Sequence, residues 1–279
     1  MRTRREVDLA LDRKFDFGEY QMNYMNYRDR RIIPSTDVVV DGMNHYRSNA
    51  YGCQGPEIEE GLPVVAVFGD SAIHGVTGDA FIHHMSIAPF QTLNAGVEGM
   101  RLPVVIDRVF ELREALGGRL VCAAVHPSWH NLLYNETGET YWTAQLDRLS
   151  PLEDEMGLAH FRLVCDICED SIVKGYDAVR AREKDYFLWG AMDFTSEAGR
   201  RAGWDAMQAF NDFLEGYCAR RGRVLIDPAP WIAPKSEADL GKKFIDFIHP
   251  SRAAYDDLAE CVTQAILPLL AGRAPAAEA

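Results

Sequence analysis

The chain has 279 residues, of which 47% are hydrophobic and 25% are charged, as in an ordinary folded globular protein. Its 42 Asp and Glu residues outnumber its 29 Lys and Arg residues, which gives a formal net charge of −13. This negative field repels nucleic acid and anionic membrane surfaces, so we expect neither as a partner. The sequence has no apolar run of the roughly 20 residues that a membrane span needs. The basic N-terminus lacks the apolar stretch of a secretory signal, and we expect a cytoplasmic protein.

The predicted strands begin after an irregular N-terminal region. Residues 1–60 lack a steady hydrophobic period, and we expect an extended arm packed on the main domain, with one short strand at 38–40. Short apolar runs then occur at 63–68, 120–125 and 224–226, with a shorter candidate at 91–93. Such valine-rich runs are typical of strands that are buried on both faces of a parallel sheet.

Amphipathic stretches separate these runs. Apolar residues recur every three or four positions over 102–116, 204–217 and 258–269, which predicts three helices. The glycines at 117 and 118 end the first helix, and Ser251 is a candidate N-cap of the third. Strands that alternate with helices predict right-handed crossovers and a three-layer α/β/α sandwich around a central, mostly parallel sheet.

This domain is expected over residues 61–272, followed by a flexible tail at 273–279. Residues at about 132–195 are expected to form an irregular insertion between a strand and the next long helix. Several aromatic residues make this insertion the candidate for a lid or an acyl pocket, among them Trp142, Phe187 and Trp189.

Polar residues follow the predicted strands at the edge where doubly wound folds bind ligands. They are Ser71, Gly96 and Asn131, together with Asp246 and His249 just before the last helix. A serine nucleophile needs a neutral imidazole as its base, and the imidazole needs a carboxylate to fix its tautomer. We therefore predict Ser71 as the nucleophile, His249 as the base and Asp246 as the group that orients His249.

The oxyanion of a tetrahedral intermediate needs N–H donors that are already in place. The predicted donors are the N–H groups of Ser71 and Gly96 and the side-chain amide of Asn131. Asn94 or a histidine side chain is the alternative third donor.

The motifs VFGDSAIHG, LNAGVEG, HPSWHN and DFIHP occur in this order and resemble the blocks of the SGNH (GDSL-type) hydrolases. The stretch HYRSNAYGCQGPE resembles the lead-in segment of one branch of that family. The resemblance implies a flavodoxin-like α/β/α sandwich with a Ser–His–Asp triad and an oxyanion hole, and it implies no cofactor and no metal. The third block departs from the family's Gly-x-Asn-Asp, since the chain has Trp129-His130-Asn131-Leu132. The Gly-x-Ser-x-Gly elbow of α/β-hydrolases is absent from the sequence.

These observations predict a serine hydrolase that cleaves an ester or thioester of a small intracellular metabolite through an acyl-serine intermediate. An acyltransferase would use the same residues with an alcohol or amine as acceptor. A non-catalytic ligand-binding relative would keep the sandwich without turnover.

Cys165 and Cys168 offer a third interpretation, because they have the spacing of half a zinc site or of a redox dithiol. The sequence contains no second such pair. Two small buried residues on one helical face are therefore the favoured interpretation.

Overall fold

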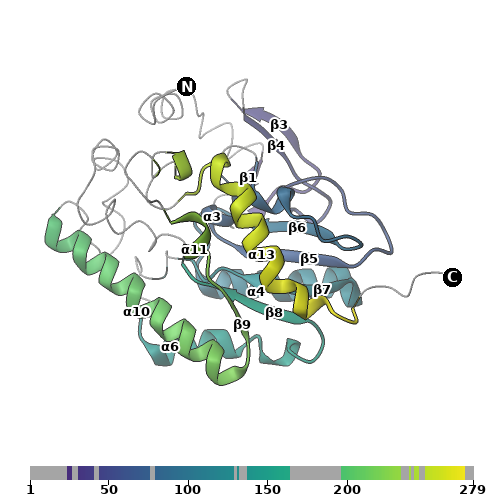
Figure 1. Ribbon diagram of the computed structural model, residues 1–279. Coiled ribbons are helices and arrows are strands. Elements are labelled where there is room, and N and C mark those ends of the chain that lie inside the picture. The colour runs from purple at the N-terminus through teal and green to yellow at the C-terminus, as the bar shows by residue number, and fades with distance from the viewer. Residues whose placement is uncertain are drawn as a thin grey trace.

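The computed structural model describes residues 24–26, 31–40, 44–75, 79–128, 131, 137–163, 196–233, 239, 242–244 and 249–273. At its centre is a parallel sheet of five strands (Figure 1): β5 (Val64–Gly69), β6 (Gln91–Gly96), β7 (Leu120–Val125), β8 (Gly157–Phe161) and β9 (Val224–Ile226). The order across the sheet is β6-β5-β7-β8-β9. This is the 2-1-3-4-5 order of flavodoxin-like sheets, whose switch point lies between the first and third strands in sequence.

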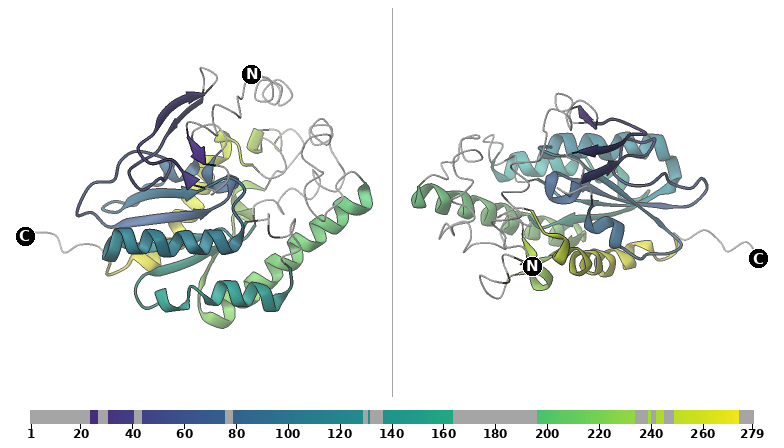
Figure 2. Two further views of the ribbon diagram at one scale, coloured as in Figure 1. Left: turned by 180° about the vertical axis from the view of Figure 1, so that it is seen from behind. Right: turned by 90° about the horizontal axis from the view of Figure 1, so that it is seen from above.

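Helices cover both faces of the sheet (Figure 2). One face carries α4 (Leu102–Leu116), α6 (Glu139–Asp147) and α10 (Glu197–Arg221); the other carries α13 (Tyr255–Leu270), α11 (Ala229–Ile232) and the short η1 (Phe81–His84). Residues of β5 enter the two cores alternately, Ala66 and Phe68 on the α4 side and Val65 and Val67 on the α13 side, as the pleat of a strand requires. The predicted α/β/α sandwich is confirmed.

The predicted elements outside the insertion correspond to observed ones. The four apolar runs form β5, β6, β7 and β9, and the three amphipathic stretches form α4, α10 and α13. α4 ends at Gly117, whose φ of 56° suits a glycine. The side chain of Ser251 accepts the N–H of Ala253 and so caps the 3₁₀ turn η5 (Arg252–Ala254) that leads into α13.

The predicted irregular insertion at about 132–195 is wrong in the part that the structure describes. Residues 137–163 contain α6, the short η3 (Ser150–Leu152) and β8, and β8 is fully buried as the fourth strand of the sheet. The sequence of β8, GLAHF, is short and contains no β-branched residue, so it gives little strand signal. It begins with Gly157 because a Cβ at this position would lie 2.9 Å from Cβ of Leu269 in α13.

Trp142 belongs to the core and not to a lid. Its side chain is buried in α6, and its ring lies edge-on to the ring of Phe210, with 4.8 Å between the centroids. Phe187, Trp189, Cys165 and Cys168 lie outside the described residues, so those predictions stay untested. The described cysteines are free and buried: Cys53, Cys122, Cys218 and Cys261.

The described part of the N-terminal arm contains two small antiparallel ribbons. β1 (Met25–Asn26) pairs with β2 (Arg31–Ile32), and β3 (Asp37–Val40) pairs with β4 (Asn44–Arg47), so the strand predicted at 38–40 is confirmed. The arm is attached to the domain by the buried Arg108 of α4, which donates hydrogen bonds to the carbonyls of Tyr51 and Gly52. None of the described helices has both the length and the apolar character needed to cross a membrane.

Candidate active site

Ser71 is the first residue of α3 (Ser71–His74), the short helix that follows β5 directly. Asp70 caps this helix, because its Oδ1 accepts the N–H of Ala72 at 3.1 Å. The turn between strand and helix requires a glycine at 69, where a Cβ would lie 2.4 Å from Cγ1 of Ile73 and 2.8 Å from Cβ of His126. Ser71 is thereby placed at the carboxyl end of β5, beside the switch point of the sheet.

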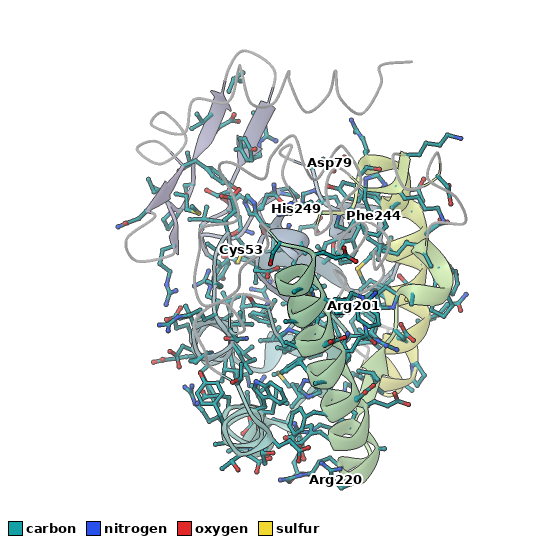
Figure 3. All side chains as sticks on the ribbon, turned by 90° about the vertical axis from the view of Figure 1, so that its left-hand side faces the viewer. Cys53, Asp79, Arg201, Arg220, Phe244 and His249 are labelled. Carbon is teal, nitrogen blue, oxygen red and sulfur yellow. The ribbon has the colours of Figure 1, made fainter. Side chains whose placement is uncertain are left out.

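His249 meets Ser71 although 178 positions separate them in sequence. Its Nε2 lies 2.7 Å from Oγ of Ser71, a hydrogen-bond distance suited to a nucleophile and its base. The segment that bears His249 is fixed by an antiparallel bridge between Phe244 and Pro250 and by a 2.7 Å hydrogen bond from the N–H of Ser251 to the carbonyl of Lys243. Figure 3 shows His249 and Phe244 at the same end of the molecule, away from Arg220.

The pair is nearly buried. Ser71 is 9% exposed and His249 is 7% exposed. Such burial strengthens electrostatic interactions at the reacting atoms. Asp246, the predicted partner of His249, lies outside the described residues, so its role stays a prediction.

The N–H of Ser71 is available for an oxyanion. Ser71 occupies the first position of α3, where backbone N–H groups have no partner within the helix. In the described part of the chain no acceptor binds this N–H. The helix N-terminus also places partial positive charge at this point.

The two other predicted donors are already engaged by acceptors close in sequence. The N–H of Gly96 donates to Oδ1 of Asn94 at 3.0 Å. Both N–H groups of the Asn131 side chain donate to main-chain carbonyls, those of Pro127 at 2.7 Å and Ser128 at 2.8 Å. For Gly96 or Asn131 to bind an oxyanion, these hydrogen bonds must be exchanged.

Asn131 fixes the loop after β7 to the start of α4, because its Oδ1 accepts the N–H of Leu102 at 2.7 Å. The side-chain amide of Asn94, the alternative third donor, also already donates its hydrogen bonds. Its Nδ2 donates to Oε1 of Gln54 at 2.6 Å and to the carbonyl of His74 at 3.2 Å.

Gly99 is a candidate donor that the sequence analysis missed. It lies in a turn in which the N–H of Met100 donates a hydrogen bond to the carbonyl of Val97. Its φ of 66° favours glycine. The N–H of Val97 donates to the carbonyl of Gly69 at 3.0 Å, which places this turn next to the strand end that precedes Ser71. Among the described residues the N–H of Gly99 has no acceptor. The second glycine of LNAGVEG is the signal that could have indicated it.

Two buried histidines lie next to the nucleophile. The ring of His126 lies behind Asp70, with 3.5 Å between its Nδ1 and Oδ1 of Asp70. Burial lowers the pKa of His126, and the nearby Asp70 partly opposes this. Burial also lowers the pKa of His74, at the end of α3, to about 4. Both rings are therefore neutral at pH 7.

Asp79 connects the chain after α3 to the start of α13. Its carboxylate forms an ion pair with Nε of Arg252 at 3.0 Å, and its carbonyl accepts a hydrogen bond from the hydroxyl of Tyr255 at 3.2 Å. His84 approaches the same carboxylate at 3.5 Å. These contacts join the Ser71 side of the site to the His249 side. Within the described ranges no cluster of three or more His, Cys, Asp or Glu side chains could hold a metal ion.

Neither protein-family models nor curated proteins match this sequence. Similarity appears among solved structures. A protein assigned to the lipolytic G-D-S-L family from Desulfitobacterium hafniense is 12% identical, with a TM-score of 0.50 over 72% of this chain and 98% of that one. A GDSL-like lipase from Bacteroides thetaiotaomicron is 12% identical, with a TM-score of 0.49 over 76% of this chain and 91% of that one. The chain thus has the α/β/α fold of a solved G-D-S-L family protein, and the SGNH resemblance is confirmed at the level of the fold.

Proposed function

We propose that the protein is a serine acyl hydrolase with Ser71 as nucleophile and His249 as general base. The observation that carries this proposal is the 2.7 Å contact between Oγ of Ser71 and Nε2 of His249 at the carboxyl end of the parallel sheet. A serine hydroxyl is a weak nucleophile on its own, and an imidazole at this distance can take its proton as it attacks.

In the proposed reaction, His249 accepts the proton of Ser71 while Oγ bonds to the acyl carbon. The resulting oxyanion binds the N–H of Ser71 together with Gly96, Gly99 or Asn131 as further donors. Collapse expels the alcohol or thiol, which receives the proton from His249 and leaves an acyl-serine. Water then attacks this ester with His249 again as base, which releases the acid and restores Ser71. Asp246 is the proposed orienting group for His249.

The proposed substrate is an ester or thioester of a small intracellular metabolite. An acyltransferase remains the alternative, because an alcohol or amine could replace water in the second step. Product analysis with a competing acceptor separates the two. The Ser71–His249 contact favours either enzyme over a ligand-binding relative that has lost turnover.

The test is intact mass spectrometry after treatment with a fluorophosphonate. The phosphorus of this reagent forms a stable bond with Oγ of an activated serine, and fluoride leaves. We expect one adduct on the wild type and none on Ser71→Ala. Ser196→Ala is the matched control, since Ser196 caps α10 through the N–H of Gly199, on a helix separate from α3. It should keep the adduct. An unlabelled, folded wild type, or an adduct on Ser71→Ala, would contradict the proposal.

A further inference from the structure

Asn94 occupies the centre of a hydrogen-bond network beside the nucleophile helix. It lies in β6, paired with Val67 of β5, and its side chain is buried. Its Oδ1 accepts the N–H of Gly96, and its Nδ2 donates both to the carbonyl of His74 and to Oε1 of Gln54. One side chain therefore joins the end of β6, the end of α3 and the N-terminal arm.

The orientation of these amides is fixed by the backbone. The N–H of Gly96 can only donate, so the Asn94 side chain must present its oxygen to Gly96 and its nitrogen to Gln54. Gln54 must then present its own oxygen, at 2.6 Å from Nδ2 of Asn94. Its Nε2 is buried, and no acceptor binds it in the described part of the chain. The side chain of Gln54 therefore acts toward Asn94 as an acceptor, and its own buried donor is left without a partner among the described residues, at a cost in free energy.

Gln54 is also held at this position by its backbone. Its N–H donates to the carbonyl of Asn94 at 3.1 Å, which makes an isolated antiparallel bridge between the arm and β6. Cys53, its neighbour, lies at the same end of the molecule as His249 in Figure 3.

The network acts where β6 and α3 are in closest contact. A Cβ at Gly96 would lie 2.5 Å from the backbone N of His74 and 2.9 Å from the carbonyl carbon of Ile73. The end of β6 therefore sits directly on the helix that begins with Ser71. A small rotation of the Asn94 side chain would change both the direction of the Gly96 N–H and the placement of α3.

We propose that Gln54 is a positioning residue for acyl transfer, which acts through Asn94 to fix the nucleophile helix against the end of β6. This inference rests on the proposed function. It assigns the N-terminal arm a direct part in forming the site, since Gln54 supplies the acceptor that keeps Asn94 in its single orientation.

The test is Gln54→Met, which keeps the size of the side chain and removes the acceptor oxygen. We expect kcat for a p-nitrophenyl ester to fall about 10- to 100-fold with KM nearly unchanged, the size of effect that misplacement by a fraction of an ångström produces. Gln91→Met is the matched control. Gln91 also joins the chain before β5 to β6, through the N–H and the carbonyl of Glu59, but at the opposite end of the strand. It should keep the wild-type kcat.

A second comparison tests the route through Asn94. Gln54→Met combined with Asn94→Ala should be no slower than Asn94→Ala alone, because residues that act through one another are not additive. Wild-type kcat in folded Gln54→Met, equal losses in the Gln54 and Gln91 variants, or additive effects in the double variant would overturn the inference and leave the proposed function intact. A wild type that neither turns over the ester nor labels at Ser71 would overturn both.

Discussion

Replacing Gly96 by alanine adds one methyl group at the contact between β6 and α3. The added Cβ would lie 2.5 Å from the backbone N of His74, whereas ordinary van der Waals contact begins at 3.4 Å. The two chains must therefore separate by about 0.9 Å. The three nearest atoms are the backbone N of His74 and the carbonyl carbon and Cβ of Ile73. The backbone of α3 fixes the positions of all three, so no side-chain rotation can relieve the overlap.

The displaced helix carries the nucleophile. If Ser71 moves by the same amount away from His249, their 2.7 Å contact lengthens to about 3.6 Å, which is no longer a hydrogen bond. A misplacement of about 1 Å costs roughly 100-fold in rate. Overpacking a close contact lowers the free energy of unfolding by about 1–3 kcal/mol. We expect Gly96→Ala to stay folded and to lose most of its activity.

The assay is the rate of ester hydrolysis together with the rate of fluorophosphonate labelling, each measured on protein shown to be folded by urea unfolding. Gly118→Ala is the matched control, because no atom lies within 4 Å of a Cβ at this position and its φ is not positive. It should match the wild type in both rates. Gly96→Ala with wild-type rates would refute the argument that this contact sets the position of Ser71.

Two further predictions concern stability. Burial lowers the pKa of His160 to about 4 in the folded protein. Between about pH 6.5 and pH 4 the unfolded state therefore binds more protons than the folded state. The free energy of unfolding falls as the pH falls through this range, by up to about 1.4 kcal/mol per pH unit. His160→Gln should reduce this pH dependence in urea titrations, while an unchanged slope would exclude His160 as a source. Asn131→Ala removes three hydrogen bonds, those that the Asn131 side chain makes with the N–H of Leu102 and with the carbonyls of Pro127 and Ser128. It should lower the free energy of unfolding by at least about 2 kcal/mol. A loss below about 0.5 kcal/mol would show that water replaces these bonds.

The strands and helices that could be predicted share one property, a strong local pattern. β5 and β7 are continuous apolar runs because both of their faces are buried, and α4 repeats its apolar residues with the period of a helix. β8 lacks such a pattern. A glycine is needed at position 157 because α13, more than 100 positions further along the chain, packs closely against it. The residues around Gly157 in the sequence give no indication of this contact.

The sequence by itself determined the order of the chemistry-bearing motifs and, through the strand pattern, the edge of the sheet to which they belong. Ser71 follows one strand and Gly96 ends another, and parallel strands end at one edge. Only the tertiary structure brought His249 to 2.7 Å from Ser71, because that contact joins residues 178 positions apart and depends on where the segment before α13 is held. Only the structure showed that the predicted donors Gly96 and Asn131 already hold local acceptors, since hydrogen-bond partners are chosen by three-dimensional distance and angle and not by spacing along the chain.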